Sequence, residues 1–362
     1  MSNKIRFCVI GAGHGGMAMA GHLAIMGFSV NLYNRTPERI WPVKLRGGIE
    51  VEGEIKGFGR LNKITSDIKE AISDVECIMV VVPATAHRDI AESLAPYLSD
   101  GQVIVLNPGR TLGALEFSQV LKWKNCNKDV IVAETQTLIY ASRVINPGQV
   151  RIFRIKNSIP VASVKAYKIP EVLKILNVPY PQFVPGDNIF KTSFDNIGAV
   201  FHPAITILNT GWIEDRTEFQ FYIQGCSPSV SKILEKLDYE RVQVAAALGI
   251  KATTAREWLY IAYDAAGKTL YEAMHANPGY RGITAPTEIN TRYITEDVPM
   301  SLVPISSLGK KFGVPTPTID SIIHLASIIS GVDYFSVGRT VEKIGIQNMS
   351  LKEIRLLAIG EE

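Results

Sequence analysis

The sequence predicts an α/β fold in which a doubly wound sheet is followed by an all-α second domain. In the first half, short apolar runs rich in β-branched residues alternate with possible helices, as in "IRFCVI", "ECIMVVVPA" and "QVIVLNPG". In the second half, segments such as "SPSVSKILEKLDYERVQVAAALGI" carry apolar residues at helical spacing. The length of 362 residues is sufficient for two domains.

The composition is that of a folded protein without a nucleic-acid or membrane partner. Hydrophobic residues make up 46% and charged residues 20%, which excludes wholesale disorder. The net charge of +3 is scattered along the chain. No apolar run reaches the roughly 18–20 residues of a membrane span, and the chain starts with a strand-like run, so we expect a cytoplasmic protein. The 4 cysteines lack metal-ligand spacing, so we expect no metal site.

The most specific motif is a glycine-rich turn between the first strand and the first helix. The run "GAGHGG" follows "IRFCVI" and opens "MAMAGHLAIMG". In a Rossmann-type dinucleotide site, Gly11 permits the tight turn, Gly13 lets the pyrophosphate approach the backbone, and Gly16 allows close helix–strand packing. The alternative is a turn that binds no ligand. We predict that the residues of this turn that bind the cofactor are Gly11, Gly13, His14, Gly15 and Gly16.

The residues after the second strand favour NADP over NAD. An NAD site usually has Asp or Glu there to hold the ribose 2′-hydroxyl, whereas this chain has Asn34, Arg35 and Thr36. The amide removes the repulsion toward a 2′-phosphate, and a guanidinium binds phosphate bidentately. The alternative is a solvated Arg35 and the use of NAD. Residues predicted to line the ribose and nicotinamide follow two later strands: Val82, Pro83, Asn107, Pro108 and Gly109.

The predicted domain boundary lies between residues 186 and 187. Residues 177–188, "NVPYPQFVPGDN", contain three prolines and a glycine and form the best linker candidate. The run before them, "VRIFRIKNSIPVASV", predicts a last pair of strands. We therefore predict a dinucleotide-binding Rossmann domain over 1–186 and an α-helical substrate domain over 187–362.

Three residues of the helical domain are candidates for chemistry. His202 stands in an apolar run, and Pro203 after it predicts that a helix starts or kinks there. On the sequence alone, a buried structural histidine is the favoured interpretation. Residues 279–299 predict a long irregular segment, which is often functional. That segment supplies Arg292, whose fork fits a carboxylate, and Asp297, which can orient an imidazole; the alternative is a surface ion pair.

Several blocks, taken in order, resemble the opine dehydrogenases, the octopine/nopaline dehydrogenase family: "GAGHGGMAMAGHLAIMG", "VVVPA", "LNPG", "VFHP", "NPGYRGI", "NTRYITEDVP", "LVPISSLG" and "VPTPTID". The resemblance covers nearly the full length. It implies a Rossmann domain, a helical domain and an active site in the cleft between them. It also implies that an α-keto acid, often pyruvate, is reductively condensed with the amine of an amino acid, using NAD(P)H, to a secondary amine dicarboxylate.

The resemblance assigns roles to the three candidates. The family's catalytic histidine falls on His202, its aspartate partner on Asp297, and a nearby arginine on Arg292, so the catalytic interpretation of His202 becomes the favoured one. Asn34 departs from the acidic residue of the NAD-using relatives, which supports NADP. One alternative is a ketopantoate-reductase-like or 2-hydroxy-acid dehydrogenase that needs no amine and uses Lys191. Another is a non-catalytic dinucleotide-binding regulator. Apolar helix faces suggest a homodimer.

Overall fold

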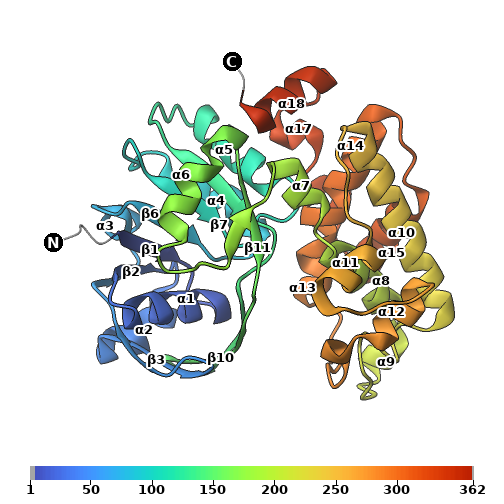
Figure 1. The fold of residues 1–362 in the computed structure, drawn as a ribbon, viewed down its shortest axis with the longest axis horizontal. Helices are drawn as coiled ribbons and strands as arrows, with labels where there is room; N and C mark the ends of the chain where they lie inside the picture. Colours follow the sequence, from blue (N-terminus) through green and yellow to red (C-terminus); the bar gives the residue numbers. More distant parts are fainter. Residues whose placement is uncertain (1–4, 361–362) are drawn as a thin grey trace. The chain divides into compact units, whose positions relative to one another are not determined.

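The first half of the chain is built on an eight-stranded sheet (Figure 1). The structure is a computed structural model and describes residues 5–360. The described residues up to Thr192, together with those from Glu353 onward, form one compact unit, and Ser193–Lys352 form a second. In sheet order the strands are β12 (Phe183–Pro185), β11 (Ile159–Ser163), β8 (Ile131–Thr135), β7 (Val103–Leu106), β6 (Cys77–Val80), β1 (Arg6–Ile10), β2 (Ser29–Tyr33) and β5 (Lys63–Thr65).

The strand order of this sheet is that of a dinucleotide-binding domain, in agreement with the predicted doubly wound sheet. From β5 through β2, β1, β6 and β7 to β8, all neighbours pair in parallel. Numbered along the chain, these six strands follow the order 3-2-1-4-5-6 of the Rossmann fold. The strand direction changes between β8 and β11, which pair antiparallel. The carboxyl ends of β1 and β6 therefore meet at the point where the strand order reverses, which is where this fold binds its ligand.

A second, four-stranded sheet was not expected from the sequence. Its strands, in sheet order, are β4 (Gly57–Arg60), β3 (Gly48–Gly53), β10 (Gln149–Ile155) and β9 (Tyr140–Asn146). Both strands of the expected last pair form, but they do not pair with each other, because β10 belongs to this sheet and β11 to the large one. The chain changes sheets over residues 156–158, where "KNS" supplies polar residues in place of the apolar run of a buried strand.

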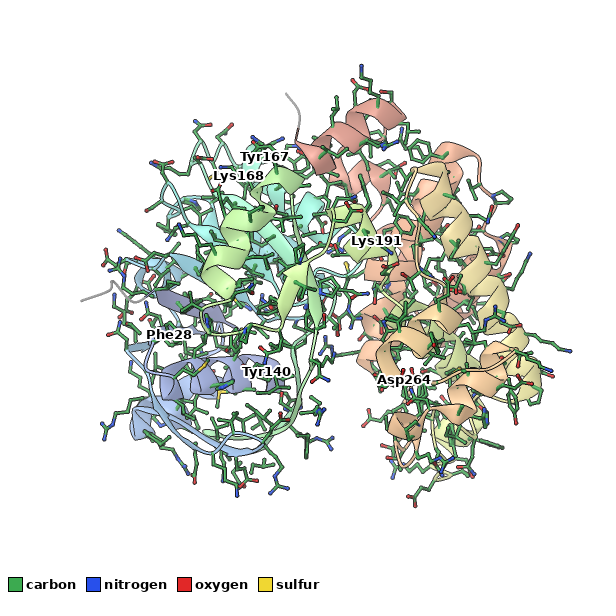
Figure 2. All side chains as sticks on the ribbon, in the orientation of Figure 1. Phe28, Tyr140, Tyr167, Lys168, Lys191 and Asp264 are labelled. Atoms are coloured by element: carbon green, nitrogen blue, oxygen red, sulfur yellow. The ribbon has the colours of Figure 1, made fainter. Side chains whose placement is uncertain are left out.

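Helix α1 (His14–Ile25) is packed on more than one face because both sheets contact it. Its residues from Gly16 to Leu23 are buried without interruption, as expected for a helix that is apolar or small all round. Tyr140, which is labelled in Figure 2, lies on β9 and its hydroxyl is 3.0 Å from His22 Nδ1 of α1. The glycine turn thus opens a helix that the core holds firmly.

The remaining helices of the first unit mostly connect its strands. Residues 177–188 were expected to form a linker, but they contribute β12 at the edge of the sheet, where proline is tolerated. The helices are α2 (Pro37–Arg46), α3 (Ile68–Ile72), η1 (Ala84–Ala86), α4 (His87–Leu94), α5 (Gly113–Trp123), η2 (Ala166–Lys168) and α6 (Ile169–Leu176). Two more helices, α7 (Ile189–Phe194) and α18 (Leu351–Ile359), lie where the chain passes from one unit to the other.

The second unit is helical, as predicted. Helix α10 (Pro228–Ala247) is capped by Ser227, and α11 (Ala255–Tyr263) and α12 (Leu270–Ala276) each begin with a capping box. The other elements are α8 (Gly198–Leu208), α9 (Thr210–Glu214), η3 (Pro278–Tyr280), α13 (Arg292–Thr295), η4 (Val298–Leu302), α14 (Val303–Phe312), α15 (Pro317–Ser330), α16 (Tyr334–Val337) and α17 (Val341–Ile344).

The expectation that a helix starts at Pro203 is wrong. Helix α8 begins at Gly198, so His202 and Pro203 lie inside it. Pro203 is the sixth residue of the helix, close enough to its start that few backbone hydrogen bonds are lost.

Among residues 5–360, no single helix is long and apolar enough to cross a membrane. Helix α15 reaches the length and apolar composition of a membrane span only when it is taken together with the segment Tyr334–Ile344, and this pair is bent by 103°.

Candidate functional site

The predicted cofactor residues of the first unit follow four neighbouring strands. The glycine turn follows β1, Asn34 follows β2, Val82 follows β6, and Asn107 follows β7. Since these strands are adjacent and parallel, all four segments lie at one edge of the sheet. This edge contains the point where the strand order reverses, so the geometry is that of a dinucleotide site.

The glycine turn has the close packing and the open space that such a site needs. Gly11 adopts a φ of +112°, and a Cβ on Gly16 would lie 1.8 Å from the carbonyl oxygen of Gly11. Neither position therefore accepts a side chain. At Gly13, in contrast, φ is −83° and a Cβ would meet nothing within 4 Å. The space beside Gly13 is the space that a pyrophosphate would use.

Asn34 has a second role that the sequence did not reveal. Its Oδ1 accepts a hydrogen bond from the backbone N–H of Ala12 at 3.1 Å, and its Nδ2 donates to the carbonyl of Thr36 at 3.0 Å. The amide therefore ties the glycine turn to the start of α2. Arg35 lies next to it with a side chain 81% exposed, and its ion-pair partner Asp89 is 3.7 Å away and also exposed. An exposed pair of this kind holds its arginine weakly.

The predicted cofactor residues after β6 and β7 offer mainly backbone groups and the buried side-chain amide of Asn107. Val82 is half-buried and Pro83 exposed, and Gly109 packs against the carboxylate of Glu134. Asn107 is 2% exposed, and its Nδ2 donates to the carbonyl of Val105. Its Oδ1 is buried and has no hydrogen-bond partner among the residues that the structure describes. A buried acceptor without a partner is costly unless a ligand or water supplies a donor, so Asn107 fits a ligand-binding position.

The predicted residues His14 and Gly15 are engaged with the protein itself. His14 Nδ1 accepts a hydrogen bond from the backbone N–H of Val144 on β9 at 2.9 Å. A Cβ on Gly15 would lie 2.6 Å from the side chain of Leu138. The second sheet and the segment after β8 thus support the turn from outside.

Sequence reasoning missed Lys156 near the same edge. Its Nζ donates to Thr137 Oγ1 at 2.7 Å, and Thr137 follows the carboxyl end of β8. Burial, together with the nearby charge of Arg110, lowers the pKa of Lys156 to about 8. No local signal marks this lysine, because its surroundings come from strands of both sheets.

In the second unit, three side chains from distant parts of the chain surround one imidazole. His202 Nδ1 lies 2.8 Å from Oδ2 of Asp297, whose side chain is fully buried. Because a carboxylate can only accept, Nδ1 donates, and Nε2 carries the lone pair of the neutral ring. Nε2 lies 2.9 Å from the hydroxyl of Tyr222. The ring of Tyr293 stacks on the imidazole with centroids 4.3 Å apart.

The arginine predicted beside Asp297 is held by its neighbour on the same turn. Arg292 Nε donates to Oε2 of Glu296, whose side chain is 2% exposed, while the arginine side chain is 61% exposed. Glu296 was not predicted. Since Asp297 is buried, it is not part of a surface ion pair, so that alternative is wrong. A guanidinium oriented through Nε and exposed at its tip can bind a carboxylate bidentately.

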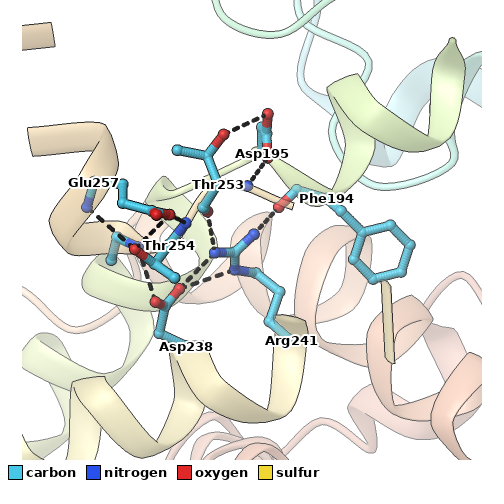
Figure 3. Close-up of polar contacts among 8 residues, drawn as sticks. Phe194, Asp195, Asp238, Arg241, Thr253, Thr254 and Glu257 are labelled. Carbon is cyan, nitrogen blue, oxygen red and sulfur yellow. Dashed lines mark hydrogen bonds and ion pairs between the residues drawn. The ribbon is translucent and has the colours of Figure 1, made fainter. Parts of the chain in front are cut away.

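The segment that leads into α8 is fixed by a buried arginine (Figure 3). Arg241 donates to the carbonyls of Phe194 and Thr253 and, at 2.5 Å, to Asp238 Oδ1. Asp195 in turn accepts from the backbone N–H of Thr253 at 2.8 Å. The buried charge of Arg241 is thus paired and hydrogen-bonded, as a charge in a protein interior must be.

A second contact ties the helix of His202 to the segment of Asp297. Asn196, just before α8, donates through Nδ2 to Ser301 Oγ at 2.9 Å, and both side chains are buried. Ser301 lies in η4, a π-helical turn that follows Asp297 directly. The segments that carry His202 and Asp297 are therefore joined by this side-chain hydrogen bond as well as by the bond between His202 and Asp297.

The other candidates lie elsewhere. Lys191, on which a carbonyl reductase would depend, is on α7, and the structure assigns it to the first unit. Within residues 5–360, no group of three or more His, Cys, Asp or Glu side chains is placed to hold a metal ion.

A Rossmann sheet with a glycine turn, followed by a helical unit with an Asp-oriented histidine, defines a nicotinamide-dependent dehydrogenase. A family model described as "NAD/NADP octopine/nopaline dehydrogenase, alpha-helical domain" matches residues 185–330, and one described as "NAD binding domain of 6-phosphogluconate dehydrogenase" matches residues 6–109. The opine dehydrogenase of Arthrobacter sp. (strain 1C) is 40% identical over 350 residues, which is 96% of this chain and 97% of that protein. The chain belongs to the opine dehydrogenase family, and it is an oxidoreductase acting on CH–NH donors that reductively condenses an α-keto acid with the amine of an amino acid.

More distant relatives agree with the fold. The octopine dehydrogenase of Pecten maximus is 25% identical, with 94% of each chain covered. A solved octopine dehydrogenase with NADH and L-arginine superposes with a TM-score of 0.83 over 99% of both chains at 23% identity. A ketopantoate reductase from Ralstonia eutropha gives a TM-score of 0.63 at 16% identity, over 90% of this chain and 99% of that one. At these identities the solved structures support the fold alone.

Proposed function

We propose that this opine dehydrogenase uses NADP(H) and that His202 is its acid and base. The observation that carries the proposal is the hydrogen bond of 2.8 Å between His202 and the fully buried Asp297, 95 residues apart in sequence. A histidine titrates near neutrality and can therefore donate and accept protons in turn. The substrates that we propose are an α-keto acid such as pyruvate and an amino acid.

The proposed roles follow from the chemistry of the condensation. The keto acid and the amine form a carbinolamine, which loses water to give an imine; His202 takes the proton that the amine loses and returns one to the departing hydroxyl. Asp297 holds the Nδ1–H of the imidazole and stabilises its protonated form. Arg292, oriented by Glu296, binds a substrate carboxylate.

The residues at the edge of the large sheet fit a dinucleotide. The space at Gly13 accommodates phosphate, and the buried Oδ1 of Asn107 needs a hydrogen-bond donor. When bound, the cofactor supplies the hydride that reduces the imine carbon. The other proposed cofactor contacts come from Gly11, His14, Gly15, Gly16, Val82, Pro83, Pro108 and Gly109.

Three residues support NADP rather than NAD. Asn34 presents no charge that would repel a 2′-phosphate, and its Oδ1 is used to hold Ala12. Arg35 is 81% exposed and can turn toward a phosphate, and Thr36 begins α2 without using its hydroxyl as a cap. A solved yersinopine dehydrogenase carries NADP+, whereas the solved octopine dehydrogenase carries NADH, so solved proteins of this fold provide examples of both cofactors.

The test is a substrate-pair screen run side by side with NADPH and NADH. We expect oxidation of NADPH with pyruvate plus an amino acid and none with pyruvate alone; turnover without an amine would contradict the condensation.

In His202→Ala, kcat should fall by about 10²–10⁴-fold. His275→Ala is a matched control, because Nδ1 of His275 bonds the carbonyl of Tyr271 of its own helix and the two rings are in contact. The cytoplasmic location and the homodimer remain predictions. The homodimer can be tested by measuring the molar mass in solution by light scattering.

A further inference from the structure

One group beside the proposed acid and base has no role so far. The hydroxyl of Tyr222 lies 2.9 Å from His202 Nε2, the nitrogen that Asp297 does not use. Both ring nitrogens of His202 are therefore engaged by side chains of the same unit. A substrate can exchange protons with Nε2 only after Tyr222 moves away or through the hydroxyl of Tyr222 itself.

The packing around Tyr222 keeps its ring in place. The ring of Tyr280 stacks on it with centroids 4.2 Å apart and an interplanar angle of 19°. The Tyr222 side chain is buried, and Phe221 contacts it edge-on at 5.0 Å. Rotating the phenol out would expose a large apolar surface and break both aromatic contacts, which stabilise the ring beyond its burial.

The backbone of Tyr222 is fastened on both sides. The N–H of Phe221 donates to the carbonyl of Ile283 at 2.8 Å, and an isolated bridge pairs Gln220 with Thr284. On the other side, Asn209, at the end of α8, donates to the carbonyl of Gly225 at 2.9 Å. The turn that carries Tyr222 is thus tied to the helix that carries His202, so the two side chains keep their separation.

A phenol suits this position chemically. Burial raises the pKa of Tyr222 well above its usual 10, and the phenols of Tyr293 and Tyr280 raise it further, so the group keeps its proton at neutral pH. A neutral phenol donates to the lone pair of Nε2, and it accepts from Nε2–H once the imidazole is protonated. Asp297, a carboxylate, can only accept. Tyr222 is therefore the partner that serves both protonation states of His202.

From this arrangement we infer that Tyr222 is a catalytic residue, whose hydroxyl remains bonded to Nε2 through the reaction and relays the protons that His202 gives and takes. In the forward step, the Tyr222 hydroxyl gives its proton to Nε2 as its oxygen receives one from the substrate side, and the return step reverses both bonds. Tyr222 therefore carries one hydroxyl proton both before and after each transfer. The inference rests on the proposed role of His202.

The test compares Tyr222→Phe with Tyr263→Phe, which also loses one phenol from this aromatic cluster, but one whose ring contacts Tyr280 and Trp258. We expect Tyr222→Phe to lower kcat by about 10–100-fold, with KM for both substrates within about threefold of wild type. Tyr263→Phe should keep the wild-type kcat. Equal kcat in wild type and Tyr222→Phe, or a lower KM as expected if the hydroxyl only blocks the site, overturns the inference.

A double-mutant cycle separates action through His202 from a structural effect. In a His202→Ala background, Tyr222→Phe should cause no further loss, whereas a general loss of folding quality would multiply the two effects. Multiplicative losses overturn the inference. Circular dichroism and the melting temperature verify that each variant folds.

A last measurement does not depend on turnover. In protein with ¹⁵N-labelled histidine, the Nε2 signal of His202 is the one missing in His202→Ala. It should move in Tyr222→Phe and stay in place in Tyr263→Phe. If wild type shows no turnover but the signal moves, the proposed function fails and the contact stands. If the signal does not move, the inference fails whatever the kinetics.

Discussion

At the scale of single residues, the proposed preference for NADP can be tested at the side chains after β2. Arg35 offers charge-assisted hydrogen bonds, and such bonds contribute about 1.5–3 kcal/mol, or about 10–150-fold in affinity. Arg35→Ala should therefore raise KM for NADPH about 10–100-fold and leave KM for NADH unchanged. Asn34→Asp should shift the ratio of kcat/KM toward NADH by more than about 10-fold, because a carboxylate repels the 2′-phosphate and accepts from the 2′-hydroxyl.

The control for Arg35 lies on α2, the helix that follows it. Arg46, in the last turn of α2, pairs with Glu50 and is far along the helix from its start, so Arg46→Ala should affect neither cofactor. If Arg35→Ala weakens NADPH and NADH equally, Arg35 does not read the 2′-phosphate and the preference for NADP is wrong.

Lys156 gives stability a dependence on pH. Its pKa is about 8 in the folded chain, against the ordinary 10.5 in the unfolded chain, so the unfolded state binds more protons between these values. The stabilising contribution of Lys156 therefore rises with pH across about 8 to 10.5 and is lost as pH falls. Urea unfolding at pH 7.5, 8.5 and 9.5 should show that Lys156→Met flattens this rise relative to wild type. Parallel curves for the two proteins would argue against a lowered pKa.

At the scale of elements, local signals predicted some features and long-range packing decided others. The glycine turn was predictable because "GAGHGG" stands between a strand and a helix within one stretch of chain. The second sheet was not, because β3 and β10 pair across about 100 residues and expose polar side chains on one face. Tyr222 was missed for a similar reason: its partner is 20 residues away and nothing local sets it apart from 12 other tyrosines.

The resemblance, not the spacing, favoured His202 as a catalyst. By composition, "AVFHPAI" predicts a core helix, and α8 is indeed mostly buried. Only the structure places the carboxylate of Asp297 at its Nδ1 and a phenol at its Nε2. Neither contact can be predicted from the local sequence, because Asp297 is 95 residues and Tyr222 is 20 residues away from His202.

The start of α1 permits a test that separates folding from binding. Gly13→Ala fits the backbone, since φ is −83° and a Cβ meets nothing within 4 Å, but its methyl group occupies space that a pyrophosphate needs. We expect an unchanged melting temperature and at least a 10-fold weaker cofactor affinity by fluorescence titration. Gly16→Ala puts a Cβ 1.8 Å from the carbonyl of Gly11, so it should lower the melting temperature itself. Tight binding in Gly13→Ala would place the cofactor elsewhere.

At the scale of the whole molecule, the end of the chain returns to the first unit. Residues from Glu353 onward group with that unit although the preceding 160 residues form the other. A Cβ on Gly360 would lie 2.5 Å from the side chain of Lys165, between β11 and η2. An amphipathic helix such as α18 can be predicted from sequence, but the surface that it covers cannot, because the partner lies far back in the chain.

This return predicts that the last helix stabilises the cofactor-binding unit. Ile354 of α18 is fully buried, so Ile354→Ala should lower the free energy of unfolding by about 2–5 kcal/mol. Arg355→Ala, a change at the exposed next residue, should have little effect. Hydrogen exchange should be faster over residues 159–176 of the first unit and unchanged in α10 of the second. NADPH at about 100 times its Kd should restore about 2.7 kcal/mol, since it binds only the folded unit. Faster exchange confined to α10 would assign the last helix to the second unit instead.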